Sequence, residues 1–130
     1  MNLTHLTALE LGRAIASGDV TIPQATQAAL EEITQRDKSL NSCITVLAEQ
    51  AMERAEDLQK GLKPGLSPLY GVPLLLKDNL CTKGVKTTCG SKLLAGYVPP
   101  YDATVVEKVQ NAGGVCLGKG NLDEIGRAHV

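Results

Sequence analysis

Apolar and polar residues alternate through the first half of the chain with the period of an amphipathic helix. The pair Thr7 and Glu10 matches a capping box, in which each side chain binds the backbone amide of the other residue. This pair predicts a helix that runs to about Ser17 and stops at Gly18, because glycine readily adopts the left-handed conformation that ends helices.

A second helix is predicted from the cap residue Thr21, with Pro23 in its first turn. Its apolar face consists of Ile22, Ala25, Ala29 and Ile33. This pattern predicts a helix that ends near Arg36. The β-rich residues 42–47 then predict a strand or an extended link, and residues 48–60 predict a third helix, closed by the glycine that follows.

The character of the chain changes after a turn-rich segment at residues 61–68. Residues 72–76 are a continuous apolar run, which is typical of a strand buried on both faces. Asp102 predicts the cap of a short helix that ends at Gly113, and residues 115–117 predict a second buried strand.

Strand, helix and strand in this order predict a parallel α/β unit, with residues 80–101 as a long irregular connection. We therefore expect an α/β fold in which a helical segment, residues 1–61, leads into an α/β segment, residues 62–124. Residues 125–130 resemble neither segment.

The composition excludes several classes of function. The chain is 43% hydrophobic and 21% charged, which is typical of a globular protein, but it has no Phe or Trp. A net charge of −1 provides no field that would attract a phosphate backbone, and three Tyr cannot form a stacking platform for bases. We therefore expect no direct nucleic-acid binding, and we interpret the basic cluster within residues 77–92 as a solvated edge.

The cysteines and histidines do not predict a metal site. The cysteines are Cys43, Cys81, Cys89 and Cys116. None of them lies in a C-x-x-C pair, and His5 and His129 are at opposite ends of the chain, so we interpret the thiols as reduced packing residues. Residues 1–5 lack the pattern of a signal peptide, and no apolar run is long enough to span a bilayer. We expect a cytoplasmic protein without a membrane partner.

The most informative single residue is Lys77, which directly follows the apolar run. Sites in parallel sheets form at the carboxyl ends of strands. Partial burial there would disfavour the ammonium and could make Lys77 a base, since a neutral lysine can accept a proton from a serine hydroxyl and so activate it. Taken alone, the pattern favours the simpler interpretation of a lysine at the solvated end of a strand.

Several linked blocks change this interpretation, because they resemble the amidase signature family. The matching blocks are residues 71–79, 81–91, 102–106 and 113–124. They occur in the family's order, and the resemblance spans residues 6–124. The sequence of residues 81–84 and 99–105 resembles that of one branch of the family, the A subunits of glutamyl-tRNA(Gln) amidotransferases.

The resemblance implies the mixed-sheet amidase signature fold, of which this chain would hold an incomplete first part, and a Ser–Ser–Lys mechanism. The family's catalytic lysine matches Lys77. In that mechanism the lysine takes a proton from a bridging serine, which activates a nucleophilic serine for attack on an amide. In the amidotransferase branch the amide is glutamine. The ammonia passes to the B subunit, which uses ATP and magnesium to amidate Glu on tRNA(Gln).

The resemblance thus implies the B and C subunits as partners and no cofactor in this chain. The two serines of the mechanism have no match, because Ser91 is the only serine after Ser67 and lies outside any Gly- and Ser-rich segment. We expect these 130 residues to be inactive alone. The alternatives are part of a general amidase for small amides, and a non-catalytic binding module built on the helices of residues 1–61.

Other polar residues of these blocks have simpler roles. We interpret Asp78, Asn79, Thr88 and Ser91 as loop hydrogen-bonding residues rather than as scaffolding for the lysine, and Asp123 as structural.

A competing nucleotide-binding interpretation rests on Gly113, Gly118 and Lys119, which match most of a P-loop. Gly120 stands where that motif needs a Ser or Thr to bind magnesium, and the intervening residues read as a strand. The amidase family usually has Thr at the position of Gly120. We therefore reject nucleotide binding and treat Gly120 as a local departure from the family.

The last six residues, 125–130, do not resemble the family's continuation after Glu124. Their sequence equals the translation of a common sequencing-adapter string. We therefore expect a non-native tail, in which Arg127 and His129 carry no function.

Overall fold

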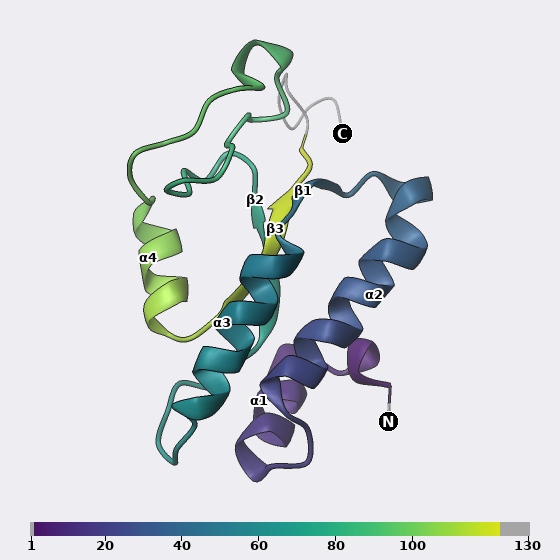
Figure 1. Cartoon of the computed structure of the whole chain (residues 1–130), viewed down its shortest axis with the longest axis vertical. Helices are drawn as coiled ribbons and strands as arrows, with labels where there is room; N and C mark the ends of the chain where they lie inside the picture. The colour runs from purple at the N-terminus through teal and green to yellow at the C-terminus, as the bar shows by residue number, and fades with distance from the viewer. Residues whose placement is uncertain (1, 123–130) are drawn as a thin grey trace.

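A computed structural model describes residues 2–122 of the chain (Figure 1). Its helical elements are a 3-10 turn η1 (Leu3–His5), α1 (Ala8–Ser17), α2 (Ile22–Leu40), α3 (Ala48–Lys60), a second 3-10 turn η2 (Lys92–Leu94) and α4 (Thr104–Asn111). Its strands are β1 (Cys43–Val46), β2 (Pro73–Lys77) and β3 (Val115–Gly120). The expected α/β class is confirmed.

Local signals set the starts of the first helices. The Thr7 hydroxyl accepts the amide of Glu10, whose carboxylate accepts the amide of Thr7, so the predicted capping box forms at the start of α1. Thr21 and Gln24 form the same kind of capping box at the start of α2. Gly18 ends α1 with a φ of 83°, which is the left-handed conformation that glycine adopts without strain.

Three helix boundaries differ from the predicted ones, and one of them is the end of α4, which lies at Asn111 and not at Gly113. Helix α2 continues past Arg36 to Leu40, because the first residue that stops it is Asn41, in the left-handed conformation with a φ of 52°. Asp102 does not cap α4, whose N-cap is Ala103. The Asp102 carboxylate instead accepts the backbone amide of Lys83 at 2.7 Å. The side chain that was predicted to cap the helix therefore binds a loop.

The three strands form one mixed sheet in the order β1-β3-β2. Strands β2 and β3 are parallel and are connected through α4, which confirms the predicted parallel unit. Strand β1 pairs antiparallel with β3. The prediction that residues 72–76 are buried on both faces is wrong for the described part of the chain, where Leu75 is 41% exposed. The reason is that β2 is an edge strand of this sheet.

The main hydrophobic core lies between the helices and one face of the sheet. Helices α2 and α3 lie side by side across that face (Figure 1). The buried core residues are Leu11, Ile15, Val20, Ile22, Ala25, Leu30, Ala51, Ala55, Val72, Val115 and Leu117. These residues come from both sides of residue 61, and the predicted division of the chain there stays a prediction.

Candidate functional site

Lys77 is the last residue of β2, and its side chain is exposed, so the expected partial burial of Lys77 is absent from the described part of the chain. It lies opposite Gly120, the last residue of β3, in the parallel register. Both strands therefore end at the same edge of the sheet, with Lys77 on that edge. This is the position that the sequence predicted for a lysine at the carboxyl end of a parallel strand.

The next residue, Asp78, is turned into the protein and is completely buried. Its backbone amide donates to the carbonyl of Gly120 at 2.9 Å, and its carbonyl accepts the amide of Cys89 at 3.0 Å. One carboxylate oxygen, Oδ2, accepts both the backbone amide of Thr88, at 2.9 Å, and the Thr88 hydroxyl. Side chains of successive residues in an extended chain point to opposite sides, which explains why Lys77 is exposed and Asp78 is buried.

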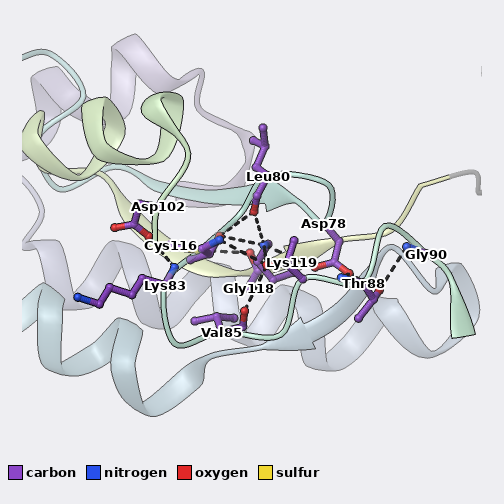
Figure 2. A network of polar contacts seen from close by, with 12 residues as sticks. Asp78, Leu80, Lys83, Val85, Thr88, Gly90, Asp102, Cys116, Gly118 and Lys119 are labelled. Carbon is purple, nitrogen blue, oxygen red and sulfur yellow. Dashed lines mark hydrogen bonds and ion pairs between the residues drawn. The ribbon is translucent and has the colours of Figure 1, made fainter. Parts of the chain in front are cut away.

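The buried cation opposite Asp78 is Lys119 of β3, whose side chain is also fully buried (Figure 2). Its ammonium donates to the carbonyl of Leu80 at 2.8 Å and to the hydroxyls of Thr82 and Thr87 at 2.9 and 3.1 Å. The remaining carboxylate oxygen of Asp78, Oδ1, lies 3.5 Å from the same nitrogen. Three N–H groups thus meet three neutral acceptors, and the carboxylate supplies the opposite charge.

A β-bulge directs Lys119 away from the hydrophobic core. The register pairs Leu74 with Cys116 but Leu75 with Gly118, so Leu117 is an extra residue on β3. Leu117 packs in the core, whereas Lys119, two positions later, joins the polar network under the loop. A regular strand would place both residues on the same face, and bulges characteristically re-aim side chains in this way.

Thr88 and Ser91 of the signature blocks make loop hydrogen bonds, and the prediction that they do not support Lys77 stays a prediction. Thr88 binds Asp78, and its hydroxyl also accepts the amide of Gly90. The Ser91 hydroxyl accepts the amide of Leu93 and thereby caps η2. Asn79 is exposed. The predictions for Asp123 and for the tail at residues 125–130 fall outside the described residues.

The sequence pattern predicted no role for Lys119 other than its place in the rejected P-loop. A usable signal was present, because a lysine inside an apolar strand must find a carboxylate, and Asp78 directly follows the neighbouring strand. The structure is also incompatible with a P-loop. Residues 115–120 are strand β3, and the ammonium of Lys119 is enclosed by protein oxygens rather than facing a phosphate site.

The thiols are free and half-buried, as expected for packing residues. Burial raises the pKa of the Cys116 thiol above its ordinary value, which keeps that group protonated and unreactive at neutral pH. Within residues 2–122 no cluster of His, Cys, Asp and Glu could hold a metal ion. In the same part of the chain, no helix combines the length and the apolar character needed to cross a membrane.

The chain is similar to known amidases along most of its length. The family model for amidases matches residues 24–129. The A subunit of the glutamyl-tRNA(Gln) amidotransferase from Moorella thermoacetica is 48% identical over 126 residues, which are 95% of this chain and 26% of that protein. Its counterpart from Lachnoclostridium phytofermentans is 42% identical over 127 residues, with the same coverage of 95% and 26%.

The fold is similar to that of solved amidases. The peptide amidase from Stenotrophomonas maltophilia superposes with a TM-score of 0.84 and is 34% identical, and the match covers 92% of this chain and 25% of that one. The chain therefore spans about a quarter of the length of the relatives that it matches.

Proposed function

Because this chain belongs to the amidase family, we propose that it is the lysine-bearing part of a glutamyl-tRNA(Gln) amidotransferase A subunit, with Lys77 as its catalytic residue. The observation that supports this role is the position of Lys77. It is exposed at the edge where the parallel strands β2 and β3 end, and the residue after it is anchored in the interior. A functional amine needs this combination of access and a fixed backbone.

The proposed chemistry is a proton relay that ends on the Lys77 amine. A bridging serine beyond this chain gives its proton to the neutral amine and takes the proton of a second serine. The second serine attacks the glutamine carbonyl and forms an acyl-enzyme. The bridging serine gives one proton to the leaving nitrogen, which departs as ammonia, and it regains its own proton from the lysine. Water then releases glutamate. A positioned base of this kind contributes roughly 10²–10⁴-fold to the rate.

The proposed assembly contains the B and C subunits as partners and glutamine as the amide substrate. The amidation of Glu-tRNA takes place in the B subunit, so ATP and magnesium are bound there, and this chain needs no cofactor. The similarity to the Stenotrophomonas maltophilia peptide amidase favours a second candidate, a general amidase that acts without tRNA. Glutamine-dependent amidation of Glu-tRNA separates the two candidates.

The test uses a chimera in which residues 1–122 of this chain replace the matching first part of the Moorella thermoacetica protein, co-expressed with the B and C subunits. We expect glutamine-dependent amidation in the chimera, and a loss of about 10³-fold in Lys77→Ala. Amidation with added ammonium chloride bypasses glutamine hydrolysis, so it should survive the substitution.

The matched control is Lys83→Ala, which removes another exposed lysine from the same region. It should leave both reactions within about twofold of the unsubstituted chimera. Equal glutamine-dependent rates in Lys77→Ala and Lys83→Ala would exclude Lys77 as the catalytic base. Hydrolysis of small amides without any amidation of tRNA would instead support the general amidase.

A further inference from the structure

The ion pair of Lys119 and Asp78 is the most completely enclosed charged group in the described part of the chain. Both side chains have no exposed area. Burying an ion pair costs desolvation free energy, and a well-packed apolar pair often stabilises a protein as well or better. Stability alone is therefore a weak reason for charges at this place, and their position directly behind Lys77 suggests another.

Asp78 transmits the effect of the buried pair to Lys77. It is the next residue in the chain, and four groups from elsewhere in the protein hold its backbone and its Oδ2 atom. Its other oxygen, Oδ1, has no hydrogen-bond partner among residues 2–122 and lies 3.5 Å from the Lys119 ammonium. Compensation of that charge therefore depends on Lys119.

We propose that Lys119 is a positioning residue for Lys77 and acts through Asp78. The proposal rests on the proposed function of Lys77 as the base. Without the ammonium, the carboxylate of Asp78 is buried and uncompensated, and it must turn toward water or take up a proton. Either change disturbs the residue that fixes the end of β2, and a displacement of about 1 Å at a reacting group can cost about 100-fold in rate.

The same ammonium also organises the loop that covers the network. Its acceptors Leu80, Thr82 and Thr87 belong to the irregular connection after β2 (Figure 2 shows Leu80 and Asp78 converging on Lys119). The backbone of Lys119 lies on β3 in register with Leu76 of β2. Its ammonium at the same time binds the segment that follows Lys77. Both the residue before Lys77 and the segment after it are held through this one lysine.

The first variant is Lys119→Met in the chimera, which keeps the length of the side chain and removes its charge. We expect kcat for glutamine-dependent amidation to fall about 100-fold with KM within about threefold, while ammonium-dependent amidation stays within about twofold. The matched structural control is Arg54→Met, which removes a guanidinium that binds carbonyls of α4 and of the residue before β3. It should lower thermal stability and leave kcat unchanged.

A second variant keeps the proposal testable if Lys119→Met does not fold. Thr88→Val removes the hydroxyl that binds Asp78 and that accepts the Gly90 amide, and it preserves the shape of the side chain and the backbone amide bond to Asp78. We expect a decrease in kcat of about fivefold, which is the worth of one hydrogen bond. A kcat equal to that of the unsubstituted chimera in either folded variant, or parallel losses of both reactions as in an unfolded complex, would overturn the positioning role.

A readout that needs no enzymatic activity separates this proposal from the proposed function. Acetic anhydride labels exposed amines, and mass spectrometry gives the labelling rates of Lys77 and of the exposed Lys63, which lies outside the loop bound by Lys119, in one sample. We expect Lys119→Met to change the rate of Lys77 at least about threefold relative to that of Lys63, because the environment of Lys77 is altered. An unchanged ratio would reject the proposal even if the chimera proved to have a different activity.

Discussion

Lys77 and Gly120 lie opposite each other at the ends of β2 and β3, and this pairing places the lysine at the shared edge of the two strands. A Cβ atom built on Gly120 would meet nothing closer than 3.8 Å, and this residue does not have a positive φ. The glycine is therefore not required by the backbone at this place.

We expect Gly120→Thr to stabilise the protein by about 0.5–1 kcal/mol, because threonine suits a strand and has less freedom than glycine in the unfolded chain. The measurement is the free energy of unfolding in urea. Gly118→Thr is the contrasting variant, since a Cβ there would lie 2.1 Å from the carbonyl oxygen of Thr45, and it should prevent folding. A loss of stability in Gly120→Thr would contradict the prediction.

Arg54 connects α3 to the last turn of α4 and to the residue before β3. Its guanidinium donates to the carbonyls of Gly114 and Gln110 at 2.9 and 2.7 Å. Removing these charge-assisted bonds in Arg54→Met should lower the free energy of unfolding by about 1–2 kcal/mol, allowing for the partial exposure of the side chain. Glu56→Gln changes an exposed residue of the same helix and should shift it by less than about 0.5 kcal/mol. Equal effects of both variants would refute this prediction.

Asp37 joins the end of α2 to the start of β1. Hydrogen bonds from the hydroxyl and amide of Ser42 and from the amide of Cys43 hold the pKa of the Asp37 carboxyl below 3.8, its ordinary value. A lowered pKa in the folded state contributes stability above pH 3.8, and this contribution is lost as the pH falls through the folded-state pKa.

We therefore expect Asp37→Asn to be less stable than the unsubstituted protein at about pH 6, and the difference to shrink as the pH is lowered from about 4 toward about 2. Urea midpoints at several pH values measure this dependence. Asp57→Asn removes an exposed carboxylate of α3 and serves as the comparison. A difference for Asp37→Asn that stays constant over this pH range would mean that the carboxylate charge is not the cause.

The 130-residue chain by itself should not hydrolyse glutamine. Lys77 is the proposed base, but the only serine after Ser67 is Ser91, whose hydroxyl caps η2. Ammonia release, measured with glutamate dehydrogenase, should not exceed that of a Lys77→Ala sample. Release above this background would show that another group in the chain serves as the nucleophile.

The local elements followed from the sequence because their causes lie within a few residues of each other. Both capping boxes and the stop at Gly18 are such cases, and the strand predicted over residues 72–76 forms one residue later, over Pro73–Lys77. The end of α2 and the cap of α4 differ from the predicted ones, because Asn41 stops α2 in the left-handed conformation and Asp102 binds a loop amide.

The sequence by itself determined the order of helices and strands and placed Lys77 at the end of a strand. Only the tertiary structure decided that Lys119 is buried against Asp78 and that Leu75 is exposed on an edge strand. The physical reason is range. Capping and strand patterning act between near neighbours, whereas the bulge at Leu117 and the pairing of opposite charges depend on which distant strands meet and in which register.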